Sequence, residues 1–183
     1  MLAVHDLEIR VGARVLMSDV AFRVSDGDKI GLVGRNGAGK TTLTKVLAGD
    51  LLPSNGGVDR SGELGYLPQD PRSGDPEMLA RTRILDARGL GSLALGMHEA
   101  SLAMADDDAA VAAKAMKKYA NLTERFEAAG GYAAEAEAAS IAHNLSLPDR
   151  ILDQQLKTLS GGQRRRIELA RILFSGADTM ILD

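Results

Sequence analysis

A glycine-rich octapeptide near the N-terminus has the residue types and spacing of a phosphate-binding loop. It matches the pattern G-x-x-x-x-G-K-[ST] through Gly34, Arg35, Asn36, Gly37, Ala38, Gly39, Lys40 and Thr41. Glycines allow the backbone to curl so that successive N–H groups point at phosphate oxygens, and a helix that follows adds the positive end of its dipole. Lys40 would then reach the β- and γ-phosphates and Thr41 would bind Mg²⁺, so the loop predicts a nucleoside triphosphate site.

A second glycine pair opens a predicted helix near the C-terminus. Its sequence is Leu159-Ser160-Gly161-Gly162-Gln163. A serine hydroxyl and glycine amides at a helix N-terminus can bind an anion. Ser160 could also act as a simple helix cap, but capping leaves the full string unexplained in a chain that also carries a phosphate loop.

Together these motifs resemble those of the ATP-binding-cassette (ABC) ATPases, in which the pentapeptide is the signature sequence. The resemblance implies that a second ABC domain, in a longer chain or in a homodimer, presents its nucleotide to Ser160, Gly161, Gly162 and Gln163. Tyr66-Leu67-Pro68-Gln69 resembles the Q-loop, and Met180-Ile181-Leu182-Asp183 resembles the Walker B strand. The implied ligands are ATP, bound by the phosphate loop with Thr42 and Gln69, and Mg²⁺, held by Thr41, by Gln69 and, through water, by Asp183.

The sequence departs from the family at two places. Val11, before Gly12, stands where ABC domains often carry an aromatic residue that stacks on adenine. The glutamate that the family uses in catalysis follows the Walker B aspartate, and this sequence ends at Asp183. We therefore expect an N-terminal fragment that contains no catalytic residue and binds ATP without turning it over.

The elements that must position these motifs predict an α/β fold with a mainly parallel core sheet, an antiparallel β region and a helical subdomain. Apolar residues alternate around Leu7 and around Phe22, which indicates strands, and the run Lys29–Val33 predicts a buried parallel strand that leads into the loop. We expect residues 1–183 to form a partial ABC domain, with its core in 2–70 and 158–183 and its helical subdomain in 71–157.

Three consecutive arginines, Arg164–Arg166, follow the signature. Glu168 lies three and four positions after two of them, which favours a solvated helix face bridged by ion pairs.

Composition excludes several other classes of protein. The chain has 22 basic and 25 acidic residues and a net charge of -3, so no overall charge attracts nucleic acid or membrane. It has no cysteine, which excludes disulfides and thiolate metal sites. No run approaches the ~20 apolar residues that cross a bilayer. A cytoplasmic protein without direct membrane insertion is expected.

Two functions from different classes fit these motifs. The segment Tyr119–Tyr132 resembles the one that precedes the signature in ABC-F proteins, which are tandem ABC ATPases that act at the ribosome in translation or antibiotic resistance. The alternative is the ATP-binding subunit of an ABC membrane transporter, and a third interpretation is a binding module without turnover. A second phosphate loop and signature downstream would favour ABC-F, whereas a single domain encoded beside a membrane protein would favour the transporter.

Overall fold

The computed structural model describes residues 1–70 and 74–183. The chain divides into two compact units, one formed by Met1–Asp70 and Gly176–Asp183 and the other by Pro71–Ser175. None of the helices in the described residues is long and apolar enough to cross a membrane.

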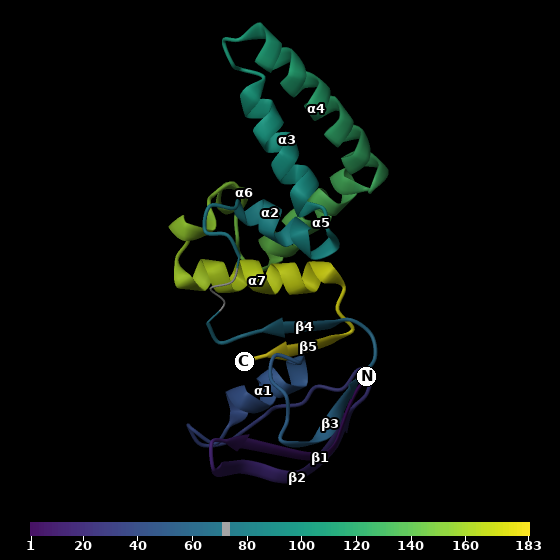
Figure 1. Ribbon diagram of the computed structural model, residues 1–183, viewed down its shortest axis with the longest axis vertical. Helices are drawn as coiled ribbons and strands as arrows, with labels where there is room; N and C mark the ends of the chain where they lie inside the picture. Colours follow the sequence, from purple (N-terminus) through teal and green to yellow (C-terminus); the bar gives the residue numbers. More distant parts are fainter. Residues whose placement is uncertain (71–73) are drawn as a thin grey trace. The chain divides into compact units, whose positions relative to one another are not determined.

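The first unit contains a three-stranded antiparallel sheet in the order β2-β1-β3 (Figure 1). Its strands are β1 (Leu2–Val11), β2 (Arg14–Val24) and β3 (Asn55–Arg60). Gly12 turns the first hairpin with a φ of 59°. Apolar residues on one face of β1 pack with helix α1 (Lys40–Ala48), and this core contains Leu2, Val4, Leu7, Ile9, Leu43, Val46 and Leu47. The predicted antiparallel region is therefore present.

A parallel pair of strands completes this unit. Strand β4 (Leu64–Leu67) pairs with β5 (Thr179–Leu182), so the Walker B segment lies beside the strand that precedes Gln69. The expected parallel sheet is represented by these two strands among the described residues.

The prediction of a buried parallel strand at Lys29–Val33 is wrong. This segment has no strand structure, and the exposed fractions of Ile30, Leu32 and Val33 are 61%, 48% and 94%. Strand structure depends on hydrogen bonds to a neighbouring strand, and none of the described strands pairs with this segment. An apolar run can predict the propensity for a strand but cannot supply its partner.

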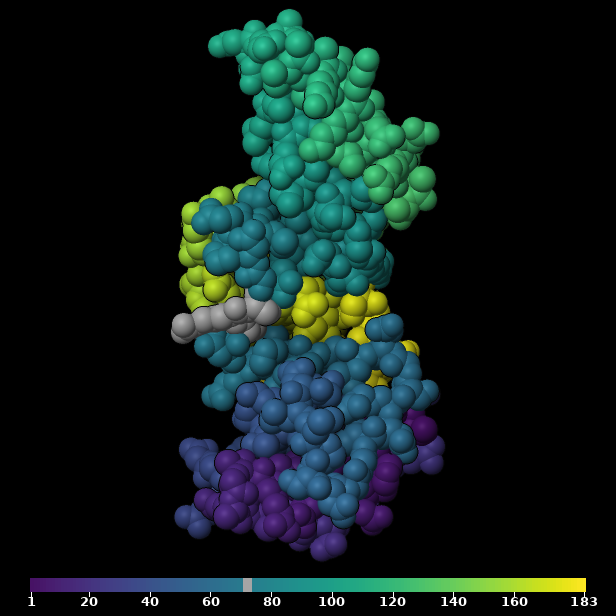
Figure 2. Space-filling view, viewed as in Figure 1, coloured from purple at the N-terminus to yellow at the C-terminus, as the bar shows by residue number. Residues whose placement is uncertain are grey.

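The second unit is helical. Its helices are α2 (Ala80–Leu85), α3 (Gly91–Ala103), α4 (Ala109–Ala128), α5 (Gly131–Asn144), α6 (Asp149–Leu152) and α7 (Gly161–Ser175), with 3-10 turns at Asp86–Arg88 and Leu156–Thr158. Within this unit α3 and α4 run side by side (Figure 1), and the surface they form projects from the remaining helices (Figure 2). The side chain of Asp108 caps α4 by accepting a hydrogen bond from the Ala110 N–H, which satisfies one of the free backbone donors at the helix start.

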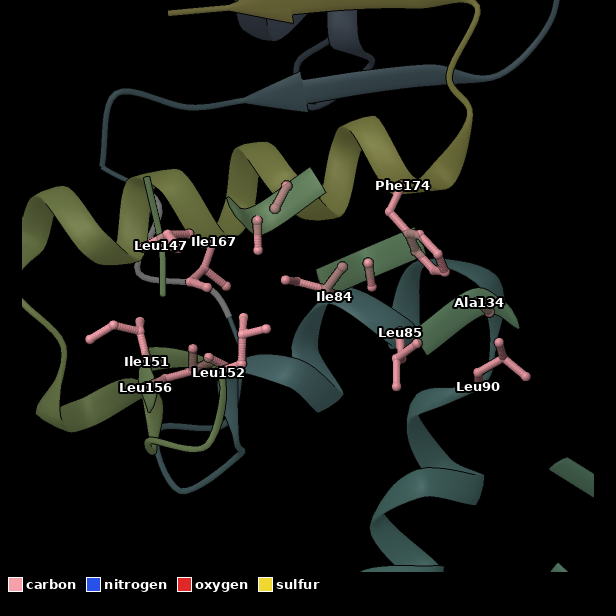
Figure 3. Close-up of a cluster of buried hydrophobic side chains, with 14 of the residues drawn as sticks. Ile84, Leu85, Leu90, Ala134, Leu147, Ile151, Leu152, Leu156, Ile167 and Phe174 are labelled. Atoms are coloured by element: carbon pink, nitrogen blue, oxygen red, sulfur yellow. The ribbon is translucent and has the colours of Figure 1, made fainter. Parts of the chain in front are cut away.

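The core of the helical unit gathers around α7 (Figure 3). Ile167, Ala170 and Phe174 of α7 are fully buried and pack with α2 and α5. For this reason the packing boundary falls at Ser175, whereas the boundary drawn from the sequence falls at residue 157.

The interpretation of Arg164–Arg166 as a solvated face bridged by Glu168 is wrong. Only 2% of the Glu168 side chain is exposed, and its carboxylate accepts hydrogen bonds from Arg83 of α2 at 2.7 Å and from Arg171 at 2.8 Å. Arg164 and Arg166 instead donate to backbone carbonyls, among them Leu156 O at 2.6 Å and Leu145 O at 3.1 Å. These arginines therefore join the start of α7 to neighbouring segments.

Candidate nucleotide-binding site

The phosphate loop depends on glycines at two of its turns. Gly37 and Gly39 have φ values of 78° and 95°, a region that strains residues with a side chain. A Cβ atom at Gly39 would also lie 3.2 Å from the Leu16 side chain and 3.3 Å from that of Met17. The loop is exposed up to Ala38, and α1 begins at Lys40. The loop-to-helix transition predicted from the sequence is thus present.

The ammonium group of Lys40 folds back onto the start of the loop. Its Nζ donates to Gly34 O at 2.8 Å and to Arg35 O at 3.0 Å. The Ala38 N–H also donates to Arg35 O, at 3.1 Å, which closes the curl. The lysine therefore places a positive charge against the loop whose backbone amides are predicted to receive phosphate.

Thr41 and Asp183 meet at the first turn of α1, although 142 positions separate them in the sequence. The Thr41 hydroxyl donates to Asp183 Oδ1 at 3.2 Å. The Asp183 N–H donates to Leu67 O at 3.0 Å, so the parallel ladder of β4 and β5 aims this carboxylate at α1.

These two oxygens suit a magnesium ion. Mg²⁺ prefers oxygen ligands in octahedral geometry at about 2.0–2.1 Å, which puts neighbouring ligand oxygens roughly 2.9 Å apart. The observed separation is close to that value. The spacing of Thr41 and Asp183 would thus suit Mg²⁺ with a direct contact at Asp183 in place of the expected water-mediated one, and the binding of the ion by these residues stays a prediction.

Gln69 lies at the same edge of the parallel pair as Asp183. It follows β4 by two residues, and Asp183 directly follows β5. The carboxyl ends of parallel strands are where α/β sheets bind ligands. Gln69 is exposed there, and its contact with the metal and the nucleotide stays a prediction, as does the contact of Thr42.

Tyr66 is a neighbour of this site to which the sequence analysis gave no role. Burial raises the pKa of its phenol against the opposing effect of the Thr44 hydroxyl, and the carboxylates of Asp183 and Asp50 raise it further. The phenol therefore stays protonated near the predicted metal ligand. Tyr66 lies in the strand before Gln69, and this position is the sequence signal that could have placed its side chain near the site.

The signature lies at the start of α7 in the helical unit, where Ser160 and Gln163 form a reciprocal cap. The Ser160 N–H donates to Gln163 Oε1 at 2.9 Å, and the Gln163 N–H donates to Ser160 Oγ at 3.3 Å. Gly161 and Gly162 are exposed, and a Cβ atom at either would meet no described atom within 4 Å. The structure shows the capping role, and the contact of these residues with a second domain's nucleotide stays a prediction.

The curled loop, the helix that follows it and the Thr41–Asp183 contact define the phosphate-loop class of nucleotide-binding proteins. Within that class the chain belongs to the family described as "ABC transporter", which matches residues 17–183. The chain is an ATP-binding ABC domain, a family that typically binds ATP with Mg²⁺ and in which such domains typically pair.

Similar proteins include members of the ABC-F group. The chain is 41% identical to the tylosin resistance ATP-binding protein TlrC of Streptomyces fradiae, over 100% of this chain and 34% of that protein. It is 32% identical to the energy-dependent translational throttle protein EttA of Haemophilus influenzae, over 93% of this chain and 30% of that protein. The chain thus spans about a third of the length of these relatives.

A solved structure of an ATP-binding subunit of an ABC transporter has the same fold. Its TM-score is 0.69 at 19% identity, and the match covers 100% of this chain and 65% of that one. At this identity the likeness shows the fold alone.

Proposed function

We propose that this chain is the nucleotide-binding part of an ABC-F-type ATPase that acts at the ribosome, in translation or antibiotic resistance. The names of two relatives support this role, because one concerns tylosin resistance and the other a translational throttle. In the proposed assembly ATP lies between this phosphate loop and the signature of a second ABC domain, with cytoplasmic ribosomes as the partner.

The observation that carries the nucleotide part of the proposal is the placement of Lys40, Thr41 and Asp183. The Lys40 ammonium can exchange its two carbonyl acceptors for phosphate oxygens, which are charged and form stronger hydrogen bonds. Thr41 and Asp183 offer neighbouring oxygens to Mg²⁺, which supplies positive charge beside the β- and γ-phosphates.

The transporter alternative has weaker support. The solved structures of transporter proteins that resemble this chain are 18–22% identical to it, so they support the fold and not the function. The relatives at 32% and 41% identity have names that concern translation and antibiotic resistance, which supports the first role.

Co-sedimentation with purified ribosomes tests the proposal. We expect more of the protein to pellet with ribosomes when Mg²⁺ and an ATP analogue that resists hydrolysis are present than when they are absent. Lys40→Ala should abolish this difference. Lys45→Ala is the matched control, because Lys45 lies in the last turn of the same helix. The ribosomal role would be contradicted if the nucleotide-bound protein did not bind ribosomes but bound membrane vesicles that carry a transporter subunit.

A further inference from the structure

The helix that carries Lys40 and Thr41 ends in a turn with several backbone acceptors. Helix α1 stops at Gly49, whose φ is 92°. The Asp50 N–H donates to Lys45 O at 2.9 Å, and the Gly49 N–H donates to Val46 O at 3.1 Å. The last carbonyls of a helix lack partners within the helix and carry the negative end of its dipole. A donor that carries a positive charge therefore suits this end.

Arg60, the last residue of β3, supplies that donor. Its Nε donates to Leu47 O at 2.7 Å and its Nη2 donates to Val46 O at 2.6 Å. Two nitrogens of one planar guanidinium thus bind two successive carbonyls, an arrangement that a lysine cannot copy. The guanidinium also lies over the terminal turn, since a Cβ atom at Gly49 would be 3.6 Å from its central carbon.

The sheet fixes Arg60 on its other side. Arg60 pairs with Leu2 across β1 and β3, and the next residue, Ser61, donates its N–H to Met1 O at 2.9 Å. At the opposite end of α1, the turn at Gly39 lies against the Leu16 and Met17 side chains of β2. The same antiparallel sheet therefore contacts both ends of the phosphate-loop helix.

We propose that Arg60 is a positioning residue for ATP binding. By holding the C-terminal end of α1 on β3, it fixes the orientation in which the N-terminal end presents Lys40 and Thr41. The helix has nine residues, so its ends are roughly 13 Å apart at 1.5 Å per residue, and a tilt at one end displaces the other. Small displacements of binding groups reduce binding and catalysis strongly. This proposal rests on the ATP binding described above.

Titration with a fluorescent ATP analogue and Mg²⁺ tests this role, at a temperature where circular dichroism shows each variant folded. Arg60→Met should weaken binding about tenfold, which corresponds to about 1.4 kcal/mol. Arg60→Lys should recover part of the loss, because one ammonium can reach one carbonyl. Arg10→Met is the matched control from the same sheet, since Arg10 pairs with Glu8, and it should change the affinity less than twofold.

The proposal would be overturned if the wild type, Arg60→Met and Arg60→Lys bound the analogue with equal affinity. This holds even if Arg60→Met has a lower melting temperature, because Arg60 would then stabilise this unit without positioning the loop. If Arg60→Met does not fold, Arg60→Lys decides, and an affinity equal to that of the wild type overturns the proposal. A wild-type protein that binds no ATP would instead overturn the nucleotide-binding function itself.

Discussion

Lys40 and Asp183 show how single side chains prepare the loop for a triphosphate. Lys40 donates to two carbonyls of the loop, and Asp183 accepts from the Thr41 hydroxyl. Each contact involves a charged group and a neutral partner. Phosphate oxygens would offer Lys40 charged acceptors, and hydrogen bonds between charged groups are the stronger ones. Mg²⁺ would offer the Asp183 carboxylate a charged partner by coordination. The contacts that order the loop can therefore be replaced by those that bind ATP.

Val11 leads to a prediction about base selectivity. Its side chain is 58% exposed before the Gly12 turn, so it offers apolar contact to a nucleobase but no aromatic face. Stacking on an aromatic side chain contributes about 1–3 kcal/mol per base. ATP and GTP should therefore bind within about tenfold of each other in a competition titration, and Val11→Tyr should increase the affinity for both.

Val111→Tyr is a suitable control for this titration, because Val111 is also exposed but lies in the helical unit. A wild-type preference for ATP well above tenfold would show that another residue recognises the base.

Among the elements, the α2–α7 contact depends on a buried charge. Glu168 is 2% exposed and its partner Arg83 is 12% exposed, so removing the carboxylate charge leaves a poorly solvated guanidinium. Breaking a buried pair by removing one partner costs about 3–5 kcal/mol. Glu168→Gln should lower the free energy of unfolding by about 3 kcal/mol in urea titrations.

Glu99→Gln provides the comparison for Glu168→Gln. Glu99 pairs with Lys118 at 3.6 Å, and both side chains are more than half exposed, so this change should cost less than about 1 kcal/mol. Equal losses in the two variants would contradict the importance of burial at Glu168.

The elements that the sequence predicted correctly are those with local signals. Alternating apolar residues indicated the strands around Leu7 and Phe22, and the glycine pattern of the phosphate loop indicated the helix that follows it, α1. The order of the motifs also linked Thr41 with Asp183, because the family resemblance supplied a long-range relation that local patterns lack.

The errors and omissions concern contacts between distant positions. Lys29–Val33 has the composition of a strand, but pairing is a property of the sheet. Glu168 pairs with Arg83, 85 positions away, and with Arg171, so its spacing from Arg164–Arg166 indicated the wrong partners. Arg60 donates to backbone carbonyls of another element. Every residue type has the same backbone carbonyl, so no residue pattern reveals such a contact.

At the scale of the whole molecule, each unit has its own core. Leu7 belongs to the core of the first unit and Ile84 to that of the helical unit, and neither is exposed. Truncating such a side chain to alanine costs about 2–5 kcal/mol. Leu7→Ala should therefore increase hydrogen exchange mainly in residues 1–70 and 176–183, and Ile84→Ala mainly in 74–175. Uniform acceleration along the chain in both variants would show a single cooperative unit.

Binding of Mg-ATP by the loop is the central claim, and a thermal-shift titration tests it most directly. A ligand at 100 times its dissociation constant adds about 2.7 kcal/mol to the stability of the folded state. The wild type and Lys45→Ala should show the same rise in melting temperature with Mg-ATP, and Lys40→Ala should show none. An equal rise in Lys40→Ala, or no rise in the wild type, would contradict the assignment of Gly34–Thr41 as the triphosphate site.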